Sequence, residues 1–192
     1  MTQCVIVEGV RSPVGRFKGK LSRLSAVELA TVVGRSLLMM TNAPKDHVNE
    51  LLLGSVLTAG QGQAPARQVA LKMGLPTTCS ATTLNKVCGS GMKALMSACD
   101  QIQAAQGDFY LCGGAESMTN APYLVTQMRE GVKFGDQMMT DHMMIDGLTD
   151  ASNKGTAMGV LAEQVVKKLG ISREEQDDFA LLSQTKTEKA QK

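Results

Sequence analysis

The sequence predicts an α/β fold, a layered αβα domain with a mostly parallel β-sheet. Over about the first 118 residues, short apolar or β-branched runs alternate with longer helical segments, which is typical of a parallel sheet covered by helices. Two Ser-x-x-Glu sequences, beginning at Ser25 and Ser172, have the pattern of a capping box and mark helix starts. The hydrophobic fraction of 43% and the charged fraction of 20% are those of an ordinary globular protein.

Four segments have the length and composition of buried strands. Continuous runs of β-branched and other apolar side chains suit a sheet that is covered on both faces. The segments are QCVIVEGV (3–10), ELLLGSVL (50–57), SATTLNKV (80–87) and DFYLCGGAES (108–117).

Three helices are expected to connect these strands. The first opens at the capping box of Ser25 and runs to about Met40. The second begins at Pro65, a residue suited to the first turn, and ends near Gly74. The third runs from Cys88 to about residue 105 with few polar side chains, so we expect it to be buried on most sides.

The chain changes character after Asn120. Residues 121–155 have no clean period, and the methionines gathered at 128–144 favour adaptable packing or a subunit contact over a cofactor site. Two helices are expected to follow. One covers 158–169 and ends at Gly170, and the other opens at Ser172 and continues through Gln191.

Charge and hydropathy exclude several classes of protein. With 20 basic and 18 acidic residues the net charge is +2, so the sequence predicts no nucleic-acid surface. No segment reaches the ~18 apolar residues of a membrane span, so no membrane partner is expected. The N-terminus lacks the basic region of a signal peptide, which makes a cytoplasmic location the expectation, although a processed organellar protein stays open.

The cysteines and histidines do not form a metal-binding pattern. Five cysteines without Cys-x-x-Cys spacing indicate reduced thiols. His47 and His142 do not stand at ligand spacing from any cysteine, so we expect no metal site.

Cys88, in NKVCGSGMKAL (85–95), is the candidate nucleophile. It follows a predicted strand and opens a predicted helix, where unpaired N–H groups and the helix dipole stabilise a thiolate. Gly89 and Gly91 leave room for a substrate and permit a sharp turn, and the N–H of Cys88 is placed to donate to an oxyanion. Free cysteines are more often inert packing residues. The residues alone therefore leave both interpretations open.

The other four cysteines have the surroundings of packing residues. Cys4 and Cys112 fall in predicted strands, and Cys99 falls on an apolar helix face. Cys79 is interpreted in the same way.

The motif resembles the nucleophile motif of the thiolases, and other segments extend the resemblance over essentially the whole chain. They are VIVEGVRSPVGRFKGKLS, GSVLTAGQGQAPARQVALKMGLP, GGAESMTNAPYLV, MIDGLTDA and ISREEQDDFALLSQTKTEKAQ. The resemblance implies that Cys88 attacks the thioester of an acyl-CoA. The acyl-enzyme then accepts the carbanion of a second acetyl-CoA, or the reaction runs in reverse. Coenzyme A thioesters are substrates, and no metal or organic cofactor is implied.

The resemblance also implies a domain organisation. Residues 1–119 correspond to the N-terminal α/β domain, and 120–192 correspond to the start of an inserted loop domain. The family's C-terminal domain carries Asn-Glu-Ala-Phe, Gly-His-Pro and second Cys-x-Gly motifs that supply the base and most oxyanion donors. None of these motifs occurs in the 192 residues. We therefore expect this chain alone to be inactive and to expose apolar surface where the missing domain would pack.

Leu148 and Met158 resemble family positions that line the pantetheine arm of coenzyme A. Ala157 departs from the His-Met-Gly of many acetoacetyl-CoA-forming members, which leaves the acyl chain length open. Three functions are retained: an acetyl-CoA C-acetyltransferase, a 3-ketoacyl-CoA thiolase of β-oxidation, and a non-catalytic half-thiolase partner. The family forms dimers or tetramers, and residues 128–144 are the candidate tetramer contact.

Overall fold

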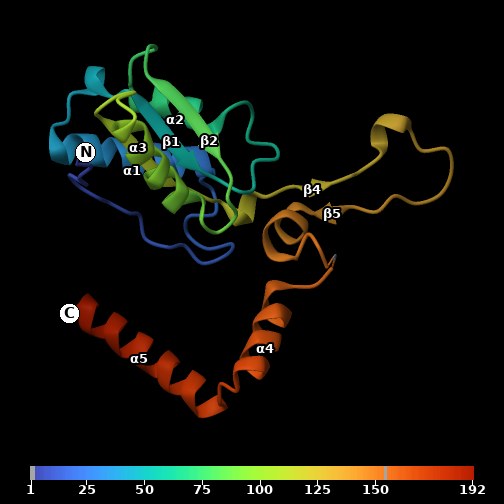
Figure 1. Ribbon diagram of the computed structural model, residues 1–192. Coiled ribbons are helices and arrows are strands. Elements are labelled where there is room, and N and C mark those ends of the chain that lie inside the picture. The colour runs from blue at the N-terminus through green and yellow to red at the C-terminus, as the bar shows by residue number, and fades with distance from the viewer. Residues whose placement is uncertain (1–2, 154) are drawn as a thin grey trace. The chain divides into compact units, whose positions relative to one another are not determined.

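The computed structural model describes residues 3–153 and 155–192 (Figure 1). Contacts divide the chain into two compact units, Met1–Gly147 and Leu148–Lys192, and each is described by itself. The predicted division after residue 119 concerns the family's domains and stays a prediction.

The first unit is built on a three-stranded parallel sheet. Its strands are β1 (Glu50–Gly54), β2 (Ser80–Leu84) and β3 (Tyr110–Gly114), in the order β2-β1-β3. Leu52 of the central strand aligns with Thr82 on one side and Cys112 on the other. The parallel sheet predicted from the alternation of strands and helices is confirmed.

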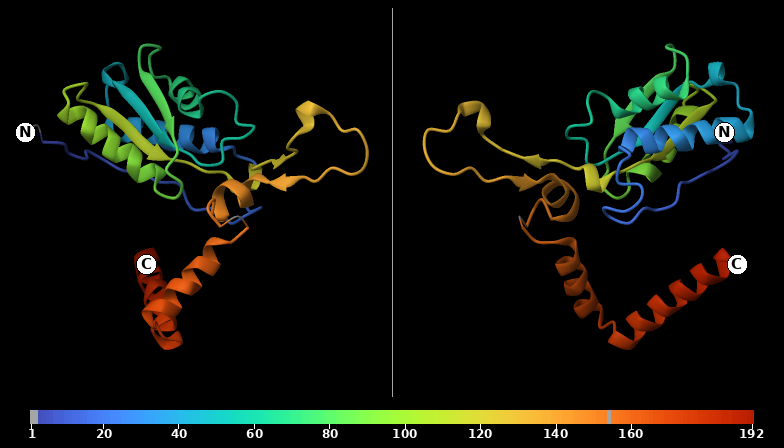
Figure 2. Two further views of the ribbon diagram at one scale, coloured as in Figure 1. Left: turned by 45° about the vertical axis from the view of Figure 1, so that its right-hand side comes forward. Right: turned by 180° about the vertical axis from the view of Figure 1, so that it is seen from behind.

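Helices cover both faces of this sheet (Figures 1 and 2). Helices α1 (Ala26–Thr41) and α2 (Pro65–Met73) pack together on one face, and α3 (Ser90–Gln103) packs on the other. Successive side chains of β1 point to opposite faces of the sheet and so contact different helices. Leu51 and Leu53 join the larger core with α1 and α2, whereas Leu52 packs with Ala94 and Ala98 of α3.

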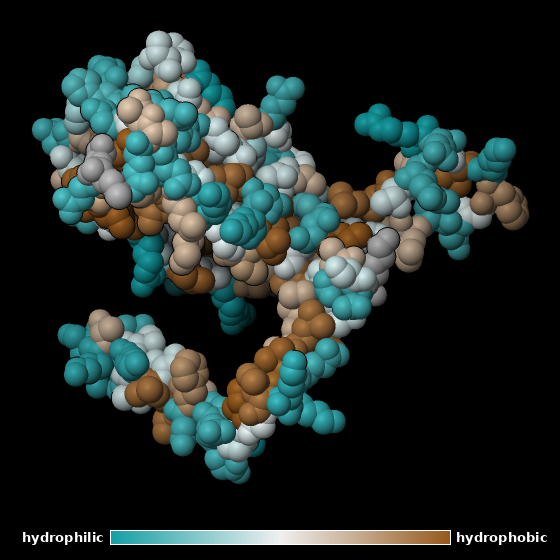
Figure 3. All heavy atoms as spheres, viewed as in Figure 1, coloured by the Kyte–Doolittle hydropathy of each residue, from teal (hydrophilic) through white to brown (hydrophobic). Residues whose placement is uncertain are grey.

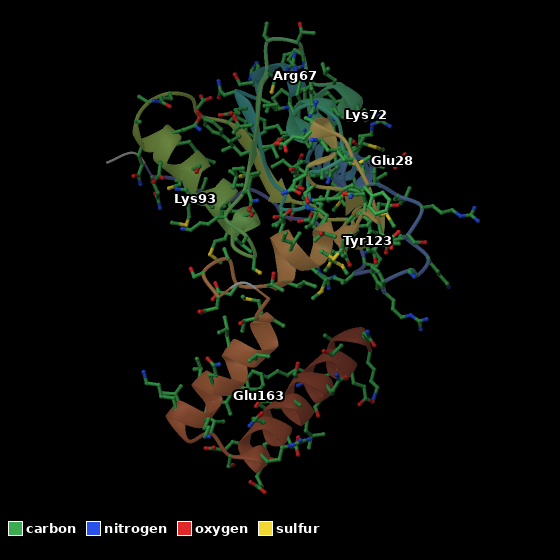
Figure 4. All side chains as sticks on the ribbon, turned by 90° about the vertical axis from the view of Figure 1, so that its right-hand side faces the viewer. Glu28, Arg67, Lys72, Lys93, Tyr123 and Glu163 are labelled. Atoms are coloured by element: carbon green, nitrogen blue, oxygen red, sulfur yellow. The ribbon has the colours of Figure 1, made fainter. Side chains whose placement is uncertain are left out.

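The helix ends follow the sequence signals. At α1 the Ser25 hydroxyl accepts from the Glu28 N–H, and the Glu28 carboxylate accepts from the Ser25 N–H at 2.8 Å. These hydrogen bonds to Ser25 lower the pKa of Glu28, and the positive charge of Lys72 on α2 adds a smaller effect (Figure 4). At the end of α2, Gly74 adopts the left-handed conformation that glycine favours, with φ of 81°.

The strand predicted at 3–10 is wrong. This segment is irregular, and Val5, Ile6 and Val7 are exposed, the last by 77%. A β-prone run forms a strand only where another strand supplies its hydrogen bonds, and β3 is an edge of the sheet in the described chain. A cavity of about 530 Å³ instead separates residues 8–17 from α1 and β3.

The expected burial of α3 is also wrong. Its buried residues are Ser90, Ala94 and Ala98, and these face the sheet. Met92 is 71% exposed, and Leu95 and Met96 are exposed as well. In the described chain this helix is the single layer on its side of the sheet, so its outer apolar face stays open.

The chain beyond β3 forms a short antiparallel ladder between β4 (Tyr123–Leu124) and β5 (Thr140–Asp141). The arm between them projects from the sheet domain and carries one 3-10 turn at Met128–Glu130 (Figure 2). Other one-turn elements lie at Lys45–His47, Met118–Asn120 and Met144–Leu148, the last with π-helical bonding.

The second unit contains α4 (Met158–Leu169) and α5 (Arg173–Gln191). As predicted, Gly170 ends the first helix in a left-handed conformation and Ser172 forms the capping box of the second. Apolar side chains of α4 remain exposed, among them Val160, Val165 and Leu169 (Figure 3). No helix in the described residues is long and apolar enough to cross a membrane.

Candidate active site around Cys88

Cys88 lies in the turn that joins β2 to α3, and it is exposed. The turn follows the carboxyl end of a parallel strand, the edge at which open α/β sheets bind their ligands. Cys88 precedes the first helical residue, Ser90, by two positions, and Gly89 is the N-cap. The predicted placement between strand and helix is therefore confirmed, while its catalytic role stays a prediction.

The sharp part of this turn falls on Val87. Val87 has φ of 48°, a left-handed conformation that is strained for a β-branched residue. Its N–H donates to the Asn85 side-chain oxygen at 2.8 Å. Gly89 has φ of −89°, and Gly91 is not among the glycines with positive φ. The sequence-based view that these two glycines permit the turn is thus corrected.

Ser90 stabilises the turn through two hydrogen bonds of its side chain. Its hydroxyl accepts from the Lys86 N–H at 2.8 Å and donates to the Val87 carbonyl at 2.6 Å. The side chain is only 4% exposed. The N–H groups of Gly89 and Ser90 donate to the carbonyls of Lys86 and Val87, so both amides are used within the turn.

The first turn of α3 is seated directly on the sheet. A Cβ atom at Gly54 would lie 2.5 Å from the Ser90 carbonyl carbon, and one at Gly114 would lie 3.3 Å from the Gly91 Cα. Glycine at the ends of β1 and β3 therefore allows the close approach of the helix. The position of the turn depends on both strand ends.

Glu116 joins these strand ends. Its carboxylate accepts from the N–H of Val56 at 2.8 Å, the N–H of Leu57 at 3.1 Å and the hydroxyl of Ser55 at 3.3 Å. The Ser55 N–H donates in turn to the Leu84 carbonyl at the end of β2.

The remaining cysteines differ from Cys88 in their surroundings. Burial raises the pKa of the Cys79 and Cys112 thiols. A hydrogen bond with Cys4 raises the pKa of Cys99. Cys79 is buried in the larger core, as a packing residue would be, whereas Cys4 does not lie in a strand as predicted. At neutral pH these raised values leave Cys79, Cys99 and Cys112 mainly as thiols.

Neither histidine is placed as a base for Cys88. His47 is exposed in the turn before β1. His142 is buried, and its Nε2 accepts from the Ala59 N–H at 3.4 Å. Its Nδ1 therefore carries the proton, which it donates to Asp146 at 2.6 Å. The two contacts of His142 connect residues 142–146 to the loop at Ala59.

The two candidate pantetheine residues belong to the second unit. Leu148 and Met158 flank an antiparallel bridge between Thr149 and Ala157, which brings their backbone positions side by side. Hydrogen bonds from the Ser152 N–H and the Asn153 amide lower the pKa of Asp150, which starts the intervening loop. The contact of Leu148 and Met158 with a ligand stays a prediction.

No group of three or more His, Cys, Asp or Glu side chains is arranged to hold a metal ion within residues 3–153 and 155–192. The expectation that no metal site is present stays a prediction.

Sequence reasoning overlooked three residues of this site. Asn85 and Ser90 belong to the motif, but they were not given roles. An Asn two residues before a strained position and a Ser at a helix start are recognised turn-forming signals. Glu116 had no local signal, because its partners lie about sixty positions earlier in the chain.

Comparison with known proteins agrees with this architecture. The family model described as thiolase, N-terminal domain, matches residues 4–192. An acetyl-CoA acetyltransferase of Cupriavidus necator is 46% identical over 192 residues, which are 100% of this chain and 49% of that protein. The enzyme of the same name from Allochromatium vinosum is 48% identical over 98% of this chain and 48% of its own length.

A solved structure is also similar. The Acat5 thiolase of Ascaris suum, in complex with coenzyme A, matches with a TM-score of 0.89 and 36% identity, covering 94% of this chain and 47% of that one. The chain spans about half the length of the curated relatives it matches. The parallel sheet, the turn at Cys88 and the family match over residues 4–192 all agree. The chain belongs to the thiolase family and corresponds to its N-terminal domain.

Proposed function

We propose that this chain carries the nucleophile of an acetyl-CoA C-acetyltransferase. Cys88 attacks the carbonyl carbon of acetyl-CoA, a thioester forms on the sulfur, and coenzyme A leaves as the thiol. The acetyl group then passes to the carbanion of a second acetyl-CoA, giving acetoacetyl-CoA and the free cysteine. In reverse the same steps cleave a 3-ketoacyl-CoA. The sulfur exchanges one thioester for another of similar energy, so the chemistry needs no metal or organic cofactor.

The observation that carries this proposal is the placement of Cys88. It is exposed at the carboxyl edge of a parallel sheet, on a turn held by Asn85 and Ser90. The names of the relatives support the acyl-transfer reaction, and the coenzyme A bound to the similar thiolase supports the substrate class. Leu148 and Met158 are proposed to contact the pantetheine arm.

Two other functions remain as alternatives. Ala157, where many acetoacetyl-CoA-forming members have histidine, favours a 3-ketoacyl-CoA thiolase with a different acyl chain. The second alternative is a non-catalytic half-thiolase partner protein, which is supported by the placement of His47 and His142 in other contacts and turns than that of Cys88. Thiolysis of acetoacetyl-CoA compared with longer 3-ketoacyl-CoA, by the protein that contains both halves, separates the first alternative from the main proposal.

We also propose that the complete protein is a dimer or tetramer, with residues 128–144 in the tetramer contact and a cytoplasmic location. The apolar side chains exposed on the arm support this contact, among them Met128, Phe134, Met138 and Met139.

The test is acetyl transfer from acetyl-CoA to the protein that contains both halves, mapped by peptide mass spectrometry. We expect an acetyl thioester on Cys88 of that protein, and no steady thiolysis of acetoacetyl-CoA by the 192-residue chain alone. The label should be lost in Cys88→Ser and retained in Cys99→Ser. Equal labelling of Cys88 and Cys99 would contradict the proposed nucleophile, and steady turnover would contradict the expected inactivity of this chain.

A further inference from the structure

We infer that Glu116 is a positioning residue for the Cys88 turn, an inference that rests on the proposed acyl transfer to Cys88. The carboxylate is half-buried just beyond the end of β3. It bonds to three consecutive residues beyond the end of β1, the Ser55 hydroxyl and the N–H groups of Val56 and Leu57. Within residues 3–153 and 155–192, no basic side chain forms a salt bridge with it. The backbone donors therefore compensate its charge.

The first link to Cys88 passes through Ser55. Ser55 is buried, and its N–H donates to the Leu84 carbonyl at 3.0 Å. Leu84 is the last residue of β2, and the chain turns into Asn85 directly after it. A shift of residues 55–57 therefore moves the base of the turn that presents Cys88.

The second link to Cys88 is the contact between the first turn of α3 and the ends of β1 and β3. The Ala115 N–H donates to the Gly54 carbonyl at 3.1 Å, which fixes the end of β3 to the end of β1. The first turn of α3 lies against Gly54 and Gly114 with no space for a Cβ atom at Gly54. Glu116 follows this junction by one residue. Its hydrogen bonds therefore hold the ends of β1 and β3 together beneath the turn.

A carboxylate suits this position better than an amide. Each of its two oxygens accepts from a different backbone N–H, and an ionised acceptor forms the stronger hydrogen bond. Glutamine keeps the size of the side chain but turns an NH₂ group toward one of the N–H donors. The Glu116→Gln change thus removes one of the two backbone contacts with little change of volume.

The experiment compares two reactions at Cys88 in the protein that contains both halves. Acetyl transfer from acetyl-CoA requires the turn to lie correctly beside a bound substrate, whereas alkylation by iodoacetamide does not. In Glu116→Gln we expect acetyl transfer to slow about tenfold, because a misplacement of about 1 Å can cost about a hundredfold and the loss of one contact should displace the turn by less. Alkylation should slow less than about threefold, so the ratio of the two rates falls. General unfolding would also lower this ratio, but it would expose buried Cys79 to alkylation. Unchanged protection of Cys79 therefore shows that the variant is folded and that the fall comes from the turn.

Asp46→Asn is the matched control, since it makes the same chemical change in the exposed turn at the opposite end of β1. Its rate ratio should equal that of the wild type. If Glu116→Gln does not fold, the same ratio is measured in Glu116→Asp. Its shorter carboxylate cannot reach both backbone donors, so the same fall in the ratio is expected. A wild-type ratio in the folded variant overturns the inference. No acetylation of wild-type Cys88 would instead overturn the proposed function.

Discussion

Val87 carries the unusual backbone conformation of the turn that presents Cys88. Its φ of 48° is costly for a β-branched residue, and the contacts of Asn85 and Ser90 hold it in place. Strain concentrated beside a functional group is common in active sites. The turn therefore depends on hydrogen bonds that a glycine at position 87 would not need.

Val87→Gly should raise the free energy of unfolding by about 1 kcal/mol, because the relieved strain exceeds the entropy that glycine loses on folding. Chemical denaturation monitored by circular dichroism measures this difference. Val87→Ala is the control, since alanine keeps the left-handed penalty and should give no gain. Destabilisation by Val87→Gly would show that the conformation is not strained.

At the scale of elements, the packing of α3 against the ends of β1 and β3 determines where the turn lies. Gly54 allows no additional atom beneath Ser90, whereas a Cβ atom at Gly91 would meet the Gly114 nitrogen at an ordinary 3.6 Å. An added Cβ atom should therefore disturb the structure at Gly54 but not at Gly91.

Gly54→Ala should lower the free energy of unfolding by about 2 kcal/mol, as expected for overpacking a tight contact. Gly91→Ala, on the same contact, should change it by less than about 0.5 kcal/mol, since alanine is favoured within a helix. Denaturant titration of both variants tests the contrast. Equal effects would mean that α3 does not lie directly on β1.

The elements also show what the sequence could predict. Local signals were sufficient for α1, α2, α4 and α5, because caps, Pro65 and terminal glycines act within a few residues. The strand expected at 3–10 failed, because strand formation depends on a neighbour that the local pattern does not contain. Cys88 was proposed as the nucleophile from the motif, and its role stays a prediction. The contacts of Glu116 could not be predicted locally, because they depend on the pairing of distant strand ends.

At the scale of the whole molecule, the chain exposes much apolar surface. The outer face of α3 is open at Met92 and Met96, close in sequence to Cys88, and the arm carries a Phe134 that is 99% exposed. Contiguous exposed apolar surface marks a site of association. The expectation from the family resemblance, that a missing domain would pack on open apolar surface, stays a prediction.

The 192-residue chain should therefore self-associate, and replacing Phe134 and Met138 by serine should shift the population toward smaller species. Sedimentation velocity measures this distribution. Met39, which is also exposed but lies on α1, is the matched control, and Met39→Ser should leave the distribution unchanged. A monomeric wild-type chain would contradict the proposed role of the arm.

The central claim is that Cys88 is the reactive nucleophile, and site-resolved alkylation tests it most directly. The chain is treated with limiting iodoacetamide at pH 7, and the modified fraction of each of its five cysteines is measured by peptide mass spectrometry. The account predicts that Cys88 reacts first, well ahead of Cys99 and Cys112, whose raised pKa values disfavour the thiolate, and that buried Cys79 reacts last. A Cys88 that reacts no faster than Cys4 or Cys99 would contradict it.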